Sequence, residues 1–151
     1  MLKFVRKLLL PGIVLLILTA CSNTETQTIR HDYTFTGESE TWSAEYIQTA
    51  WEKYIIPEDE DKRVEYETSK KYNFELRYKG EQSDLEDIKQ LHYKYEGRGG
   101  SGSMNMEGPI PAELLKSGAS GTGTMLKEDS IIKVNVDWDG KSEQFELRVK
   151  E

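Results

Sequence analysis

The chain has 151 residues, of which 36% are hydrophobic and 31% are charged, and its formal net charge at pH 7 is −7. This length suits one folded domain preceded by a leader. The excess of acidic residues opposes binding to nucleic acid, whose phosphates carry charge of the same sign. We therefore expect no nucleic-acid partner.

The first 20 residues have the organisation of a secretory signal peptide. A basic segment with Lys3, Arg6 and Lys7 precedes an apolar run over residues 8–18. That run is shorter than the ~20 residues that a membrane-spanning helix needs. Because the leader carries these three positive charges and no acidic residue, its removal would change the formal charge from −7 to −10.

The leader ends in Leu18-Thr19-Ala20-Cys21, which resembles the lipobox of bacterial lipoproteins. The resemblance implies cleavage between Ala20 and Cys21 and a diacylglycerol on the thiol of Cys21. Two acyl chains would hold the protein on a membrane, since each buried methylene contributes ~0.8 kcal/mol. We therefore expect a lipid anchor on the extracytoplasmic face of the cell membrane. An uncleaved N-terminal anchor is the alternative, and it also leaves the remaining chain outside.

Cys21 is the only cysteine, so an intramolecular disulfide is not possible. The segment from Ser22 to Thr28 has no apolar residue. It predicts a flexible tether over residues 21–30, followed by a folded domain over residues 31–151.

Within this domain, apolar and polar residues alternate, which is typical of half-buried strands. The alternation runs through residues 33–36, 42–46, 71–79 and 93–95. At the C-terminus it runs through Ile132–Trp138 and returns through Phe145–Val149. Asp139-Gly140 between these last two runs suits the tight turn of a β-hairpin.

Four segments interrupt the alternation. Ser83-Asp84-Leu85-Glu86 has the pattern of a helical capping box, and a second helical turn is expected over residues 112–116. Glycine and serine dominate residues 97–103 and 118–123, which predicts two loops. These patterns together predict a mainly β fold, a small antiparallel β-sandwich with one or two short helical turns. An immunoglobulin-like topology is one form of it, and a sandwich is favoured over a barrel or an α/β fold.

Parts of the domain resemble small uncharacterised lipoproteins of Bacillus-type Gram-positive bacteria. The similar parts are Phe35-Thr36-Gly37-Glu38-Ser39 followed by Trp42, the stretch Leu85–Tyr95 with the glycine-serine run after it, and Val134–Lys141. The resemblance implies this topology and this compartment. It brings no activity with it.

Acidic residues and histidines are the natural candidates for a metal site. Glu58-Asp59-Glu60-Asp61 is a consecutive run, whereas calcium loops place their ligands at alternating positions around a glycine. We interpret this run as a solvated loop. His31 and His92 are the only histidines, so a zinc site would need carboxylates to complete it. We therefore predict no metal and no cofactor.

Catalytic motifs are equally weak. Gly100-Ser101-Gly102-Ser103 does not match the Gly-x-Ser-x-Gly turn between a strand and a helix. Arg98 lies in the same glycine-rich run, but no Gly-Lys-Ser/Thr sequence follows that could hold a phosphate. The spacing of a hydrolytic carboxylate pair is spatial, so a small hydrolase stays open as a third alternative. Our leading prediction is that the protein is not an enzyme.

Aromatic residues are abundant for so polar a domain, with eight tyrosines and three tryptophans. Those at alternating strand positions are expected in the core: Trp42, Tyr46, Tyr72, Phe74, Tyr78 and Trp138. Four others form a candidate binding patch, with edge packing as the alternative: Trp51, Tyr54, Tyr66 and Tyr95. We therefore expect a membrane-anchored binding or structural module, with an envelope protein as candidate partner. An accessory factor of an envelope enzyme or transporter, whose glycine-serine loop orders on contact, is the alternative.

Overall fold

The computed structural model describes residues 24–58, 61 and 63–150. The expected signal peptide, its cleavage site and Cys21 lie outside these described residues. The fold is mainly β, as predicted. Its elements are β1 (Glu25–Glu38), β2 (Trp42–Ile56), β3 (Glu65–Tyr78), helix α1 (Gln82–Glu86), β4 (Gln90–Gly97), β5 (Gly100–Glu107), 3₁₀ helix η1 (Ala112–Leu115), β6 (Lys116–Thr122), β7 (Ile132–Trp138) and β8 (Lys141–Val149).

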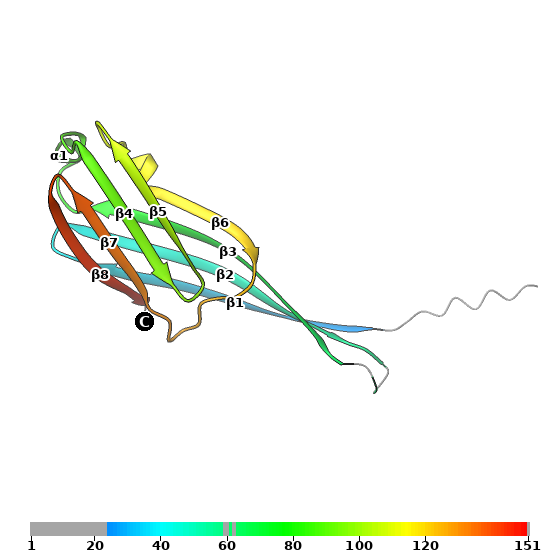
Figure 1. Ribbon diagram of the computed structural model, residues 1–151. Helices are drawn as coiled ribbons and strands as arrows, with labels where there is room; N and C mark the ends of the chain where they lie inside the picture. The colour runs from blue at the N-terminus through cyan, green and yellow to red at the C-terminus, as the bar shows by residue number, and fades with distance from the viewer. Residues whose placement is uncertain (1–23, 59–60, 62, 151) are drawn as a thin grey trace, which may run out of the picture.

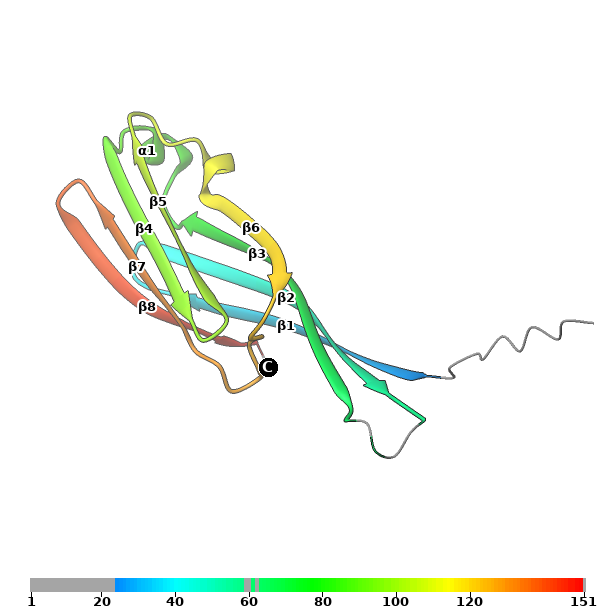
Figure 2. The same ribbon diagram turned by 45° about the vertical axis from the view of Figure 1, so that its right-hand side comes forward.

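The strands form one antiparallel sheet in the order β5-β4-β7-β8-β1-β2-β3-β6. The sheet curls so that β1, β2, β3 and β6 form one layer and β4, β5 and β7 form the other (Figures 1 and 2). Strand β8 links the layers, because it pairs with β7 along most of its length and with β1 only through Arg148 and Val149. The predicted antiparallel sandwich is thereby confirmed. One curled sheet supplies both layers, whereas an immunoglobulin domain uses two sheets.

The core lies between the two layers and is made by the inward positions of the alternating strands. Trp42 and Phe35 are fully buried in the first layer, and Val134 and Val136 are fully buried in the second. Aromatic rings connect the layers, since the Phe74 and Tyr95 rings stack with centroids 4.1 Å apart. The aromatic residues expected in the core are buried or pack against it.

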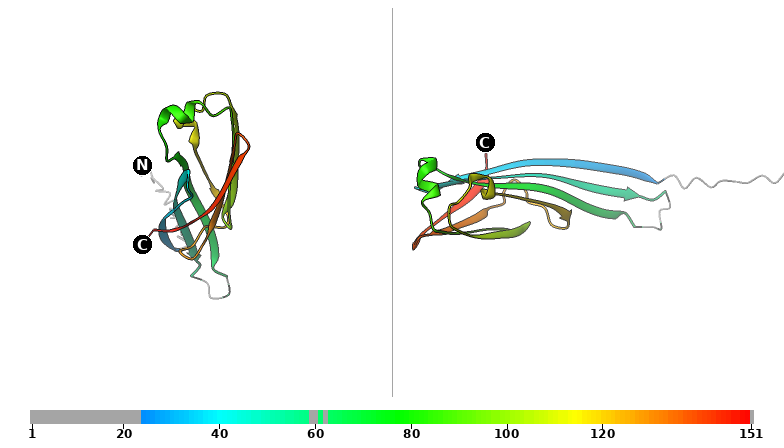
Figure 3. Two further views of the ribbon diagram at one scale, coloured as in Figure 1. Left: turned by 90° about the vertical axis from the view of Figure 1, so that its left-hand side faces the viewer. Right: turned by 90° about the horizontal axis from the view of Figure 1, so that it is seen from above.

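Strands β1, β2 and β3 continue beyond the core as a three-stranded arm (Figure 3). We define the arm as residues 25–30, 51–56 and 65–68, and the body as residues 31–50 and 69–150. The arm strands pair only with one another, since β8 reaches β1 at Phe35 and Thr36 and β6 reaches β3 no further than Ser69. No arm residue is buried. Both faces of the arm are therefore open to solvent.

The flexible tether expected over residues 21–30 is wrong from Glu25 onward. Strand β1 begins there and pairs with β2 from Glu25 opposite Ile56 to Glu38 opposite Ser43. Threonines alternate through this segment, and their β-branched side chains favour extended backbone. The apolar alternation that marks a half-buried strand is missing because neither face of the arm is covered by the body.

The two predicted glycine-serine loops are also wrong in large part, because they form the two edge strands β5 and β6. Close packing explains the small residues. A Cβ atom on Gly102 would lie 2.3 Å from the Tyr95 hydroxyl, and one on Gly118 would lie 2.8 Å from the Tyr72 carbonyl oxygen. The loop between β4 and β5 shrinks to residues 98–99, because Gly97 pairs with Gly100.

The C-terminal hairpin and the second helical turn are confirmed by β7, β8 and η1. In the hairpin turn Asp139 and Gly140 both have positive φ, at 44° and 79°. The first helical turn is also confirmed, by α1, but the capping box is wrong, because α1 begins at Gln82 and its N-cap residue, Glu81, makes no side-chain capping bond. Helix α1 is instead held by its apolar side, through which Leu85 enters the core.

Candidate functional site

The two histidines lie in different parts of the fold and do not form a common site. His31 is on β1 at the root of the arm, where its Nε2 lies 3.0 Å from Glu52. His92 is on β4, and its Nδ1 lies 3.3 Å from Asp137 on the neighbouring strand β7. Among the described residues no group of three or more histidine, cysteine or acidic side chains is arranged to hold a metal ion.

The predicted aromatic patch is divided by the structure. Tyr95 is wrong as a member of it, because it is 3% exposed and belongs to the core. The other three residues lie on the arm, where Tyr54 and Tyr66 face each other across β2 and β3 with ring centroids 5.2 Å apart. Trp51 is an odd number of residues from Tyr54 on the same strand, so its side chain lies on the opposite face.

The face of the arm that carries Tyr54 and Tyr66 continues the core-facing side of the first layer. Tyr66 is 53% exposed, and Ile29, a further apolar residue on this face, is 39% exposed. At the base of this face Glu52 accepts a hydrogen bond from the Tyr66 hydroxyl at 2.8 Å, and its second carboxylate oxygen contacts His31. We call His31, Glu52 and Tyr66 the arm-root cluster. It links all three arm strands.

In the arm-root cluster, the neighbouring side chains stabilise the ionised form of the Glu52 carboxylate. The hydrogen bond from Tyr66 lowers the pKa of Glu52 below its ordinary value, and the contact with His31 adds to this effect against the opposing effect of desolvation. The same hydrogen bond raises the pKa of Tyr66 to about 12. Glu52 is therefore ionised at neutral pH, and the protonated Tyr66 hydroxyl is its hydrogen-bond donor.

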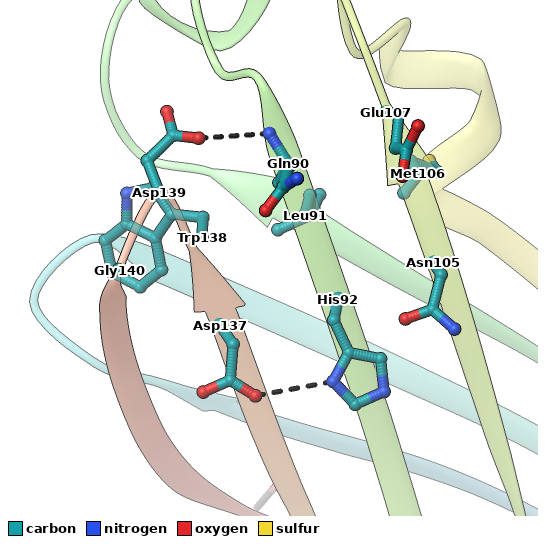
Figure 4. Close-up of a pocket in the computed structure, with 10 residues that line it drawn as sticks. All are labelled: Gln90, Leu91, His92, Asn105, Met106, Glu107, Asp137, Trp138, Asp139 and Gly140. Atoms are coloured by element: carbon teal, nitrogen blue, oxygen red, sulfur yellow. Dashed lines mark hydrogen bonds and ion pairs between the residues drawn. The ribbon is translucent and has the colours of Figure 1, made fainter.

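A shallow groove of about 450 Å³ lies on the outer face of β5, β4 and β7 (Figure 4). It is close to the end of the body that lies opposite the arm. We call this end the far pole and define it by the β1–β2 turn (residues 39–41) and the β7–β8 turn (residues 139–140). The polar side chains that line the groove include His92, Asn105, Glu107 and Asp137.

The groove can accept hydrogen-bond donors or positive charge, because three carboxylates line it and lysine or arginine does not. Hydrogen bonds from Ser142 and, more weakly, from His92 lower the pKa of Asp137. Asp139 is occupied as a turn residue, since its carboxylate accepts the backbone N–H groups of Lys89 and Gln90 at 3.0–3.2 Å. Serine, threonine and cysteine do not line the groove, so it offers no side-chain nucleophile beside His92.

The far pole is also fixed by a partly buried carboxylate, that of Glu143 on β8. It accepts hydrogen bonds from the hydroxyls of Ser39 and Thr41 at 2.5 and 2.6 Å and from the backbone N–H of Thr41 at 3.1 Å. Desolvation acts to raise the pKa of Glu143, but these hydrogen bonds outweigh it and the pKa lies below the ordinary value. Glu143 thereby fastens the β1–β2 turn to β8.

Replacing Glu143 with glutamine is expected to lower the free energy of unfolding at pH 7 by about 1–2 kcal/mol, because charge-assisted hydrogen bonds are lost. The sign of the pH dependence follows from the lowered pKa. The contribution of Glu143 is fully present above its unfolded pKa of about 4.3 and is lost as the pH falls through the lower folded value. Urea unfolding at pH 7 and pH 3 measures this effect.

The control is Glu146→Gln, which changes an exposed carboxylate on the same strand whose ion pair is with Arg148. We expect this control to stay within about 0.5 kcal/mol of the parent, as isolated surface ion pairs do. A Glu143→Gln deficit that is as large at pH 3 as at pH 7 would show that the carboxylate charge does not fasten the turn.

Sequence reasoning missed the arm-root cluster, Glu143 and the buried Gln48. For Gln48 a signal existed, because it is a polar residue at an inward position of the alternating run from Trp42. Its amide donates to the Leu126 carbonyl at 3.0 Å and accepts the Leu126 N–H at 3.1 Å. Glu143 and the arm-root cluster gave no such signal, because their partners are distant in the sequence.

In the part of the chain that the structure describes, no helix combines the length and the apolar character needed to span a bilayer. Comparison of the chain with protein-family models, curated proteins and solved structures finds no match to any of them.

Proposed function

We propose that the protein is a lipid-anchored extracytoplasmic lipoprotein that presents its β body as a non-enzymatic binding or structural module. The observation that carries the proposal is the sequence Leu18-Thr19-Ala20-Cys21, placed directly after a basic segment and an apolar run. Order, spacing and hydrophobic context agree with a lipobox. The resemblance of short sequence segments to small lipoproteins of Bacillus-type bacteria would imply the same compartment.

The position of β1 supports this proposal. Its first residue, Glu25, is only four residues after Cys21 and lies at the tip of the arm, at the opposite end of β1 from the body's far pole. A lipid on Cys21 would therefore hold the arm tip near a membrane without burying any part of the body. The net charge of −10 expected after cleavage keeps such a tethered domain soluble.

The accessory-factor alternative depended on a glycine-serine loop that orders on contact. Since residues 100–103 are already paired with β4, that premise is lost. A hydrolase that works with a pair of carboxyl groups uses one of them, with a raised pKa, as its proton donor. Where a carboxyl pKa among the described residues departs clearly from its ordinary value, it is lowered. The presentation role is therefore the better supported proposal.

Replacing Cys21 with alanine tests the lipid anchor. We expect the parent purified from membranes to lack residues 1–20 and to carry a diacylglycerol on Cys21, and the Cys21→Ala chain to carry no lipid and to leave the membrane fraction. Intact-mass spectrometry and membrane fractionation measure this. The β body should stay folded by circular dichroism, because Cys21 precedes every described strand.

Ser22→Ala is the matched control, since it changes the next residue and leaves the thiol in place. It should fractionate and gain mass as the parent does. An unmodified thiol at position 21 in the parent, or a Cys21→Ala chain as firmly membrane-bound as the parent, would contradict the proposal.

A further inference from the structure

The arm occupies the place where a flexible tether would be expected between a lipid and a folded domain. We infer that the arm is a stiff spacer that holds the body off the membrane and turns the far pole outward. This inference rests on the proposed lipid anchor at Cys21. It adds to that proposal a defined height and a defined orientation of the body.

The direction of the spacer follows from the topology. Strand β1 runs from Glu25 at the arm tip to Glu38 beside the far pole, so the residue nearest Cys21 is also the residue farthest from that pole. Glu25 is four residues after Cys21, and four residue-to-residue steps span at most ~14 Å. A lipid on Cys21 therefore restricts the arm tip, and not the body, to the vicinity of the bilayer.

The stiffness of the arm comes from pairing across all three strands. The backbone of β2 is paired on both sides, with β1 and with β3. On one face the arm-root cluster and the Tyr54–Tyr66 ring pair link the strands. On the other face Lys53 and Glu67 form an ion pair at 3.2 Å. A single polypeptide tether would have none of these restraints.

The charge at the arm tip favours a standing arm over one that lies on the membrane. Residues 57–67, which include the β2–β3 connection, contain six acidic and two basic residues. Anionic lipid headgroups would repel this segment. The tip therefore stays in the aqueous layer above the headgroups, tethered there by the lipid.

The far pole is then the surface that faces away from the membrane. From Thr28, which lies in the same cross-strand row as Glu67, β1 continues for ten residues to Glu38, a distance of ~33 Å. The groove beside the β7–β8 turn lies near this pole and is lined by Glu107, Asp137 and Asp139. This groove therefore lies well above the lipid headgroups when the arm stands upright.

Fluorescence energy transfer in liposomes tests the spacer. Lipidation consumes the only native thiol, so one added cysteine can be labelled specifically on the lipidated full-length protein. We choose Glu67→Cys on the arm, Asp129→Cys at the arm-side end of the body and Glu40→Cys at the far pole. The acceptor is a dye on the headgroups of phosphatidylcholine–phosphatidylglycerol vesicles. Transfer should decrease in this order, with the far-pole value less than about half of the arm value because ~33 Å or more separates them.

A second part of the experiment disrupts the strand pairing of the arm. Lys53→Pro removes an N–H from the central strand of the arm, where proline is not tolerated, while Lys53→Ala removes only the ion pair with Glu67. With Lys53→Pro, energy transfer from the dye at position 40 should rise, and the distribution of fluorescence lifetimes of that dye should broaden. With Lys53→Ala it should stay at the parent value.

The outcomes separate the two proposals. Protein that lacks the diacylglycerol or does not float with the vesicles overturns the lipid anchor and, with it, the spacer. Lipidated protein that floats but shows equal transfer from positions 67, 129 and 40 overturns the spacer alone. The same is true if Lys53→Pro leaves transfer from position 40 unchanged.

Discussion

Replacing Trp42 with alanine is expected to lower the free energy of unfolding by about 3–5 kcal/mol, which makes it one of the most damaging single substitutions in the chain. Trp42 is fully buried. Its ring packs edge-on against Tyr78 in the same layer and against Trp138 in the opposite layer, at centroid distances of 5.2 and 5.5 Å. Truncation therefore opens a cavity at the junction of both layers. Chemical denaturation followed by circular dichroism measures the loss.

Trp42→Phe is the matched control, and its expected loss is less than about 2 kcal/mol. Phenylalanine keeps most of the apolar surface and also removes the indole Nε1, which is buried and finds no acceptor among the described residues. A buried donor without a partner costs about 1–3 kcal/mol, so its removal offsets part of the lost packing. Equal losses for the two variants would show that the size of the ring does not determine the stability of this junction.

The parts of the fold that could be predicted from the sequence are those with one face in the core. Residues 71–79 and the C-terminal hairpin alternate strictly, because every second side chain enters the core while the others meet solvent. The Asp139-Gly140 turn was equally predictable, since both residues tolerate positive φ. In these segments the residue types and the pattern of burial both indicate the same strand or turn.

The parts that could not be predicted are strands without a buried face or with unusually small side chains. The arm has no covered face, so β1 shows no apolar alternation over residues 25–28. Strands β5 and β6 are edge strands whose glycines make room for the Tyr95 hydroxyl and the β3 backbone. The need for small side chains at these positions comes from residues far away in the sequence, so a local sequence pattern does not indicate it.

The same limit applied to the candidate aromatic patch. Tyr95 has polar neighbours in sequence, yet its ring stacks on Phe74 and its hydroxyl reaches Ser117 on β6 at 3.1 Å. Tyr54 and Tyr66 come together because β2 and β3 place them in register, which requires knowledge of the pairing. Residue type alone could select these tyrosines but could not sort them into core and surface.

Replacing Gln48 with leucine is expected to lower the free energy of unfolding by about 2–4 kcal/mol, because a buried N–H and a buried C=O of Leu126 would both lose their partner. Gln48 is fully buried and Leu126 is 1% exposed, so water cannot easily replace the amide. The two hydrogen bonds fix the segment that follows β6 over the arm-side end of the core. Denaturation at several pH values should show a loss that does not vary with pH.

Gln48→Glu separates hydrogen bonding from size, since the side chain is nearly isosteric. A protonated carboxyl can accept from the Leu126 N–H and donate to the Leu126 carbonyl, whereas the ionised form can only accept and is also buried away from water. The pKa of this carboxyl should therefore be raised in the folded state. The loss in free energy of unfolding relative to the parent should be small below pH ~4. It should grow as the pH rises from the pKa of the carboxyl in the unfolded chain, about 4.3, toward its higher pKa in the folded state. This dependence is opposite in sign to that of Glu143, and a difference between parent and Gln48→Glu that is constant from pH 4 to pH 7 would contradict the assigned role of the Gln48 amide.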